Sequence, residues 1–448
     1  MTELYELTVD DAASLIRNGN ISPVDLSESI LAQIKRLDPI LKAWVYLDED
    51  AVINDARLKE QEANSGINLG ALHGVPIGLK DIYHNAPIPT TACSKVYANF
   101  IPDHDATTVS KLKQAGAIML GKTVTTEFAC GDPSPTINPW NPDHTPGGSS
   151  SGSAVSVASR MCPAALGSQT VGSVLRPASY NGVVGFKPTL GRVSRYGVIP
   201  VSWTLDTMGW MTRTVKDAAL LLSVMDGHDP NDPISTTSTV KFDGDVSVIT
   251  NPKIGVIRDF FVEKADSETQ QKFLDIVDKF ARAGAEVVDI KLPDSFSYAI
   301  GDQQLIMSVE GAAFHKPMFD VQSEDYQPNI RAMIQRGLDT DATSYSDALE
   351  RRLRFVSDMN VIANQVDVLL TPSTPSPALP DITNTGNTMF QGPWTYCGLP
   401  TVTVPSGLSD GGMPLGIQLI GQYLNESLLL SVSAWCESVM GVDLNPNL

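Results

Sequence analysis

The sequence predicts an α/β protein in which helices cover both faces of a sheet, preceded by a helical N-terminal region. A helical pattern followed by a glycine and a short apolar strand occurs at 106–120 and again at 268–290. Three further apolar stretches, at 368–370, 401–404 and 417–420, are strand candidates. Alternation of helix and strand in this way is typical of layered α/β domains.

The first 65 residues have helical patterns. Ser22 followed by Pro23 and Asp25 predicts a helix start, because serine caps the first turn and proline suits its first position. Four apolar residues behind it fall on one helical face: Leu26, Ile30, Ile34 and Leu37. We therefore expect a helical N-terminal region at 1–65 and an α/β domain at 66–448, packed as one integrated unit.

The later elements follow in chain order. Residues 106–115 predict a helix, and 117–120 a strand after the intervening glycine. Thr214 starts another helix. The stretch 227–250 is polar and is expected to be a surface excursion. At 268–290 the helix carries an apolar face before its glycine and strand.

Composition argues against several classes of function. The formal charge is −19 with a pI of about 4.6, so bulk electrostatics disfavour nucleic acid and anionic lipid as partners. The five cysteines are scattered and none forms a CxxC pair, so neither a disulfide framework nor a zinc site is indicated. The acidic first residues do not resemble a signal peptide, and no apolar stretch approaches membrane length. We expect a soluble, cytoplasmic protein.

One segment, 145–191, is crowded with small residues and holds two Gly-Ser clusters, GGSSSGS at 147–153 and GSQTVGS at 167–173. A flexible linker should not lead directly into the apolar, helix-like stretch 154–158. A phosphate cradle would need a Walker lysine or a strand–GxGxxG–helix frame, and neither is present. The third interpretation is a serine nucleophile beside backbone N–H donors, because glycines allow close approach and a tight turn makes an anion-binding nest.

A set of motifs spread over nearly the whole chain supports this third interpretation. They are GVPIGLKD at 74–81, NPWN at 138–141, GGSSSGSA at 147–154, GVVGFKPT at 182–189, LDTMG at 205–209, GLP at 398–400 and PLGIQLIG at 414–421. In these motifs the sequence resembles the amidase signature family. The resemblance implies a single α/β/α domain around a large mixed sheet, and a helical N-terminal region that often helps to build a homodimer. It implies no cofactor and no metal.

The resemblance also implies a Ser–cis-Ser–Lys triad. Its nucleophile would be Ser173, its bridging serine Ser149 with a cis bond to Gly148, and its base Lys80. The two serines lie 24 residues apart, as in the family. A serine hydroxyl needs an adjacent base, and no motif supports a histidine or a G-x-S-x-G elbow here. A lysine can be that base only when neutral, and burial favours neutrality; the apolar stretch before Lys80 predicts burial, although a lysine at a strand end is otherwise simply solvated.

Further site residues follow from the same resemblance. The oxyanion hole would be formed by backbone N–H groups of four consecutive residues: Thr170, Val171, Gly172 and Ser173. Ser150 and Gln169 would support the triad, Ser150 having a turn-forming role as its alternative. Cys130 and Gly131 would line the acyl side of the substrate site, although a small buried thiol is an equally simple role for Cys130.

Two departures from the common family pattern concern specificity. The sequence has Gln169 where many members have aspartate, and Arg176 stands three residues after the nucleophile rather than two. Both features resemble the malonamidase-like branch, whose arginine binds a substrate carboxylate. The alternative for Arg176 is a salt bridge or carbonyl cap near the nucleophile loop. Pocket size is expected to depend on loops at 292–345 and 381–396.

The sequence therefore predicts a serine hydrolase that cleaves linear amide C–N bonds through an acyl-enzyme, with small acid-amides as candidate substrates. One alternative is a carbamate- or anilide-cleaving amidase, a urethanase. Another is the amidase subunit of a tRNA-dependent amidotransferase, which GRVSRYG at 191–197 more distantly resembles. A catalytically silent binding protein is the alternative outside enzymes. The intact Lys80, Ser149 and Ser173 argue against it.

Overall fold

The computed structural model describes residues 3–65, 69–237 and 241–448. Its strands are β1 (Trp44–Leu47), β2 (Pro76–Lys80), β3 (Ile118–Thr123), β4 (Ala164–Gln169), β5 (Val184–Lys187), β6 (Thr207–Thr212), β7 (Lys253–Ile257), β8 (Glu286–Ile290), β9 (Val368–Pro372), β10 (Thr401–Leu408) and β11 (Pro414–Ile420). The described strands form one 11-stranded sheet in the order β1-β3-β2-β4-β6-β5-β10-β11-β9-β7-β8. Parallel pairs join β2 to β3 and β4, and β7 to β8 and β9, while the other neighbours are antiparallel. The predicted α/β fold around a large mixed sheet is confirmed.

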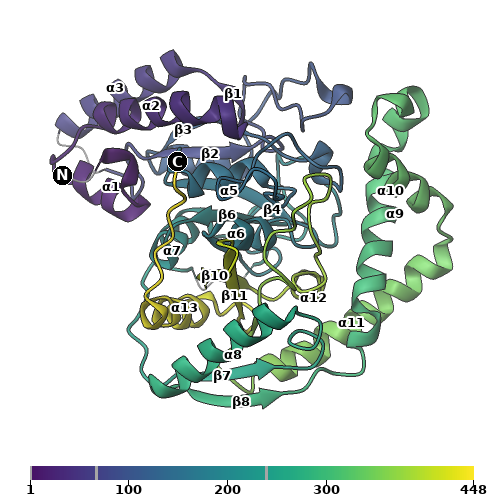
Figure 1. Ribbon diagram of the computed structural model, residues 1–448. Helices are drawn as coiled ribbons and strands as arrows, with labels where there is room; N and C mark the ends of the chain where they lie inside the picture. Colours follow the sequence, from purple (N-terminus) through teal and green to yellow (C-terminus); the bar gives the residue numbers. More distant parts are fainter. Residues whose placement is uncertain (1–2, 66–68, 238–240) are drawn as a thin grey trace.

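Helices pack against this sheet along the whole chain (Figure 1). They are α1 (Val9–Arg17), α2 (Pro23–Leu41), α3 (Glu49–Asn64), α4 (Thr107–Gln114), α5 (Ser151–Ala158), α6 (Leu175–Asn181), α7 (Val215–Met225), α8 (Ser267–Arg282), α9 (Phe296–Gln322), α10 (Pro328–Asp339), α11 (Ala342–Ala363), α12 (Gly392–Tyr396) and α13 (Glu426–Met440). The predicted helices that start at Ser22 and Thr214 are present, and each of these residues caps its helix through its side chain.

The N-terminal region is mainly helical, but it also supplies a strand that the sequence patterns did not predict. β1 pairs antiparallel with β3 and forms one edge of the sheet. Every residue of β2, β4, β5, β6, β9 and β11 is buried. Such strands read as continuous apolar or small-residue runs, without the alternation of a half-exposed strand.

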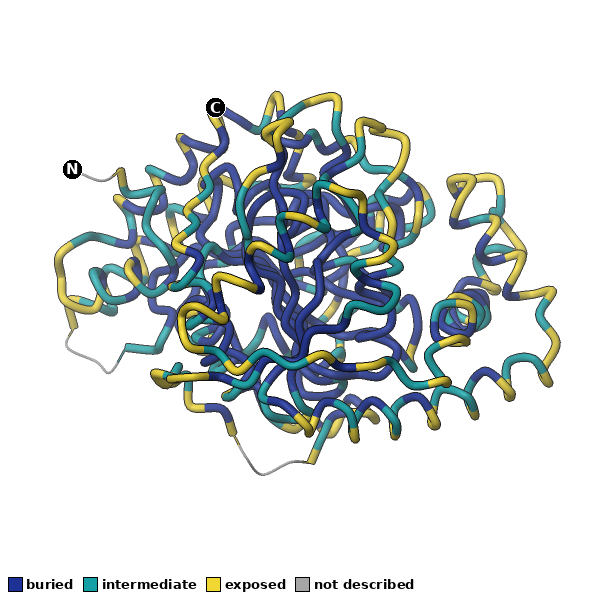
Figure 2. Tube along the Cα trace, turned by 60° about the horizontal axis from the view of Figure 1, so that its bottom comes forward, coloured by how far each residue is buried: buried dark blue, intermediate teal, exposed yellow. Residues whose placement is uncertain are grey.

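Residues 296–363 form a helical arm made of α9, α10 and α11, which stands at one side of the sheet in Figures 1 and 2. The expectation of a loop at 292–345 was therefore wrong. Gly301, Gly311 and Pro317 lie inside α9, and all three residues disfavour a helix in sequence patterns. α9 also buries polar side chains among its apolar ones, so no clear apolar face marks it. At 381–396 the loop ends at residue 391 and α12 follows.

The polar excursion contains no helix or strand in its described parts, 227–237 and 241–250. It is nevertheless anchored: Phe242 is buried, and Asp232 is buried in an ion pair with Arg195 at 2.9 Å. The expected surface excursion is thus packed against the body on one side. Residues 238–240 of that expectation lie outside the described residues.

Candidate active site

Lys80 is the last residue of β2, which lies between β3 and β4 and runs parallel to both. Its side chain is fully buried. Burial lowers the pKa of Lys80 to about 7, although the nearby negative charge of Asp206 acts in the opposite direction. No carboxylate of the described residues lies within 4.0 Å of its nitrogen. The sequence expectation of a buried lysine that is readily neutral fits this environment.

The Lys80 nitrogen has two hydroxyl partners. It donates to Ser149 Oγ at 2.7 Å and to Ser168 Oγ at 2.9 Å. The peptide bond between Gly148 and Ser149 is cis, as the family resemblance implied. Ser168 was not singled out from the sequence, although it lies in the second Gly-Ser cluster. Ser150 lies behind it, with its buried hydroxyl 3.4 Å from the Ser168 backbone nitrogen.

Ser173 follows β4 and precedes α6. It is the one residue between Thr145 and Thr189 that is not buried. The structure therefore presents this hydroxyl at the surface of an otherwise closed segment, which suits a nucleophile. The predicted hydrogen bond between Ser149 and Ser173 is absent, since no described residue is a hydrogen-bond partner of the Ser173 hydroxyl.

The loop at 170–173 is held through its carbonyl groups. The Thr170 carbonyl accepts from Gln303 Nε2 at 3.1 Å, the Val171 carbonyl from the Thr395 hydroxyl at 2.8 Å, and the Gly172 carbonyl from the backbone N–H of the first turn of α6 at 3.0 Å. In a trans peptide the N–H points opposite to the carbonyl. The next N–H group in each case, those of residues 171, 172 and 173, is thus turned away from these contacts, and none has an acceptor among the described residues.

Thr170 is held a second time, through its side chain. Its hydroxyl donates to Asp206 Oδ1 at 2.6 Å, while Asp206 Oδ2 accepts from the backbone nitrogens of Val201 and Ser202 at 2.8 and 3.0 Å. Burial raises the pKa of Asp206, and these hydrogen bonds favour its charged form. Asp206 belongs to the LDTMG motif, but its contact with the nucleophile loop could not be read from the sequence.

Gln169 caps α6 from the preceding strand. Its Oε1 accepts from the backbone nitrogens of Val174 and Leu175 at 2.9 and 3.0 Å, and its Nε2 donates to Thr395 Oγ1 at 2.9 Å. Gln169 therefore ties the strand before Ser173 to the helix after it. The expectation that Gln169 supports the site from nearby has this geometric counterpart.

The Arg176 side chain is buried, and its guanidinium contacts two backbone carbonyls. It donates to Gly148 O at 2.6 Å and to Gly386 O at 2.5 Å, while its Nε has no partner in the described structure. Burial lowers the pKa of Arg176 to about 10. The carbonyl contacts correspond to the cap that was the alternative to carboxylate binding. They join the cis-serine turn to the loop at 381–391.

Cys130 and Gly131 lie beside α10. Cys130 is partly exposed, its Sγ is 3.9 Å from Met333 Sδ, and burial raises the pKa of its thiol. Gly131 is exposed, and its carbonyl accepts from Asn329 Nδ2 at 3.2 Å. The structure thus places both residues where the helical arm meets the body.

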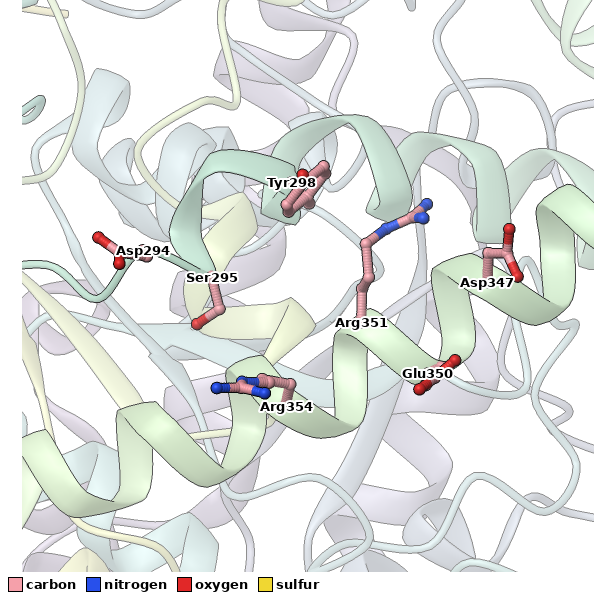
Figure 3. A pocket seen from close by; sticks show the side chains of 7 residues that line it. All are labelled: Asp294, Ser295, Tyr298, Asp347, Glu350, Arg351 and Arg354. Atoms are coloured by element: carbon pink, nitrogen blue, oxygen red, sulfur yellow. The ribbon is translucent and has the colours of Figure 1, made fainter.

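A separate hollow of about 390 Å³ lies between α9 and α11, on the outer part of the arm (Figure 3). It is lined by Asp294, Ser295, Tyr298, Asp347, Glu350, Arg351 and Arg354. None of the predicted site residues lines it. The candidate active site is therefore the cluster around Lys80, Ser149 and Ser173, and not this hollow.

A mixed sheet that carries a buried lysine and two serine-rich turns fits an enzyme that hydrolyses amides, and comparison with known proteins agrees. The Amidase family model matches residues 25–430, and the chain belongs to this family. It is 35% identical to one of the subunits of glutamyl-tRNA(Gln) amidotransferase from Chloroflexus aurantiacus and equally to its counterpart from Desulforapulum autotrophicum, each alignment covering 96% of both chains.

Solved structures give the same answer. The peptide amidase from Stenotrophomonas maltophilia superposes with a TM-score of 0.86 at 29% identity, covering 99% of this chain and 98% of its own. A 6-aminohexanoate cyclic dimer hydrolase superposes with a TM-score of 0.89 at 25% identity, covering 100% and 99%. The protein is an amidase, a hydrolase of carbon–nitrogen bonds in linear amides.

Two features are absent from the described residues. No helix among them is both long and apolar enough to cross a membrane. Within the same residues, no group of three or more His, Cys, Asp or Glu side chains is arranged to hold a metal ion.

Proposed function

We propose that Ser173 is the nucleophile of this amidase, that Lys80 is its base and that Ser149 carries the proton between them. The observation that supports this assignment best is the 2.7 Å contact of the Lys80 nitrogen with Ser149 Oγ, combined with a Lys80 pKa of about 7. A lysine with that pKa is substantially neutral at physiological pH. It can therefore accept a proton, which an ordinary lysine cannot.

The reaction would proceed in two halves. Neutral Lys80 takes the Ser149 proton while Ser149 takes that of Ser173, and the Ser173 oxygen attacks the amide carbonyl. The tetrahedral intermediate collapses as the proton returns through Ser149 to the leaving nitrogen. Water then attacks the acyl-enzyme ester by the same relay, which releases the acid. The missing Ser149–Ser173 hydrogen bond is expected to form with substrate, because catalytic hydrogen bonds often tighten only in the complex.

We propose that the backbone N–H groups of Val171, Gly172 and Ser173 bind the oxyanion, with Thr170 at the start of the loop. Their support is the set of carbonyl contacts that turns the N–H groups away from protein acceptors. A single donor of this kind is worth roughly 3 kcal/mol of transition-state stabilisation. The donors are main-chain groups, so the side chain of Val171 is not required.

Arg176 is proposed first as a positioning residue, because it donates to the carbonyl that precedes Ser149. A second proposal is a preference for acid-amides, and one observation favours it. The buried Arg176 guanidinium has an unpartnered Nε and no carboxylate within 4.0 Å among the described residues. A substrate carboxylate near the acyl side, where Cys130 and Gly131 lie, would supply the missing negative charge.

The relatives' names favour another assignment of the same chemistry, an amidase subunit that passes ammonia to partner proteins acting on tRNA. Hydrolysis by the isolated chain separates the two proposals. A stand-alone amidase turns over without partners, and light scattering in solution tests the predicted homodimer at the same time. The cytoplasmic location stays a prediction from the sequence.

The central experiment is Ser173→Ala measured on a panel of substrates. Malonamate, an aliphatic amide, an aryl anilide and an aryl carbamate cover the substrate classes, including the urethanase alternative. Ser173→Ala should remove hydrolysis of every substrate and also labelling by a fluorophosphonate. Ser110→Ala, a partly exposed serine on α4, is the matched control and should behave as wild type. Labelling that persists in folded Ser173→Ala would assign the nucleophile elsewhere.

A further inference from the structure

One contact joins the helical arm directly to the nucleophile loop. Gln303, on the first half of α9, is buried, and its Nε2 donates to the Thr170 carbonyl at 3.1 Å across 133 positions of sequence. Nothing in the amide chemistry of the triad calls on this residue. Its position is nevertheless one peptide away from the proposed oxyanion donors.

The Thr170 carbonyl and the Val171 N–H belong to one peptide plane. Fixing the carbonyl oxygen therefore fixes the direction of the N–H, because the two groups point opposite ways in a trans peptide. Without its acceptor contact, this plane could rotate about the flanking single bonds and turn the donor away from the substrate. Donor direction matters because the stabilisation depends on N–H groups aimed in advance at the developing charge.

Gln303 is itself held in place by its surroundings. The next residue along the chain towards the N-terminus, Asp302, accepts two 2.7 Å hydrogen bonds from Arg351 on α11, and the two form an ion pair. Figure 3 shows Arg351 reaching from α11 towards α9. Gly392 at the start of α12 packs so closely that a side chain there would lie 2.5 Å from Gln303 Oε1. The amide can therefore scarcely move without moving α9 or α12.

We infer that Gln303 is a positioning residue for the oxyanion loop, and that through it the packing of the α9–α11 arm sets the rate of the chemical step. The inference rests on the proposed function, since it takes residues 171–173 as the oxyanion donors. Loss of the Gln303 contact lowers kcat and leaves substrate binding in the ground state nearly unchanged. A residue that only stabilised the fold would lower the melting temperature without this kinetic signature.

Two variants test the inference from different sides. Gln303→Met keeps the length of the side chain and removes the donor, while Gln303→Asn keeps the amide and withdraws it from Thr170. Gln304→Met is the matched control, because Gln304 is the exposed neighbour on the same helix. The readouts are kcat and KM on one amide, and the inhibition constant of a trifluoromethyl ketone, whose adduct with the serine carries an oxyanion.

Both Gln303 variants should lose roughly 10- to 100-fold in kcat, with KM within about twofold of wild type, as expected for a misplaced catalytic group. The ketone should bind more weakly by a similar factor, and Gln304→Met should match wild type. Unchanged kcat in the two variants, a loss confined to KM, or failure of both variants to fold would each overturn the inference. An inactive wild type, or an active Ser173→Ala, would instead overturn the proposed function itself.

Discussion

Lys80 and Lys122 are buried on adjacent parallel strands and point to opposite faces of the sheet, but only Lys122 has a carboxylate partner. Lys122 pairs in register with Leu79, the residue before Lys80, so the two lysines alternate in direction. The Lys122 nitrogen is 3.7 Å from Asp81 Oδ1, whereas Lys80 contacts only serine hydroxyls. Burial lowers both pKa values, that of Lys80 to about 7 and that of Lys122 to about 8. The residue without a carboxylate is the one suited to act as a base.

The pH dependence of catalysis should reflect this difference. Because the base must be neutral, we expect kcat/KM to rise with pH through an ionisation near 7, the value of the Lys80 pKa, and to stay high on the alkaline side. The apparent pKa belongs to the coupled Lys–Ser group as a whole. Lys80→Ala should lose roughly 10²–10⁴-fold, and Lys80→Arg should not restore activity because guanidinium stays protonated. Lys95→Arg, an exposed lysine, is the control; wild-type activity in Lys80→Arg would refute the neutral-lysine mechanism.

Stability should change in the opposite direction from activity. The pKa of Lys80 is about 7 in the folded protein against an ordinary value of 10.5, so the unfolded chain binds more protons between these pH values. The contribution of this residue to stability therefore improves as pH rises from about 7 towards 10.5. Lys80→Met should be more stable than wild type at pH 7, on the order of 1–4 kcal/mol, and the gap should narrow at pH 10. Denaturant unfolding at both pH values measures it, and a gap that widens with pH would contradict the prediction.

Ser168 should matter for catalysis as the second partner of Lys80. A neutral amine has two N–H groups and one lone pair, so an N–H donated to Ser168 leaves the lone pair free to face Ser149. Ser168→Ala should therefore lower kcat by roughly 10- to 100-fold, the scale expected for a misoriented catalytic group. Ser159→Ala is a matched control, because Ser159 is buried but its hydroxyl donates only to the Val155 carbonyl. Equal kinetics for the two variants would remove Ser168 from the site.

Arg176→Ala distinguishes the two roles proposed for that residue. Its contacts with Gly148 and Gly386 predict that acid-amide and neutral amide substrates lose activity together, since the serine turn would shift for both. A carboxylate-binding role predicts instead a loss of about 2–4 kcal/mol for the acid-amide and much less for the neutral one. The test compares kcat/KM for malonamate and for a neutral amide of equal size. A selective loss for malonamate would assign Arg176 to the substrate.

Much of the framework could be predicted from the sequence because it is local. The helix starts at Ser22 and Thr214 depend on capping residues next to them, and the helix–glycine–strand units depend on short-range periodicity. The pairing of Lys80 with Ser149 spans 69 positions, and it came from motif resemblance, with no local pattern to indicate it.

Other parts could not be predicted, for identifiable physical reasons. β1 is short and lies among helical patterns, so only its pairing with β3 defines it. α9 contains a proline and two glycines and buries polar groups, which hides its helical period. Gln303 and Thr395 act on backbone carbonyls of a distant loop. A backbone carbonyl is the same at every position, so no side-chain pattern in the sequence points to such a partner.

The positions of these partners also fix when a growing chain can become active. Lys80, Ser149 and Ser173 have all been synthesised by residue 173, but the hydroxyl that holds the Val171 carbonyl comes from Thr395, 224 positions further on. At roughly 5–20 residues per second, a ribosome needs more than ten seconds to cover that distance. During this time the nucleophile and its base exist without a fixed oxyanion loop. An unfinished chain therefore carries the reactive groups while lacking the means to use them, and hydrolysis begins only once nearly the whole protein has been made.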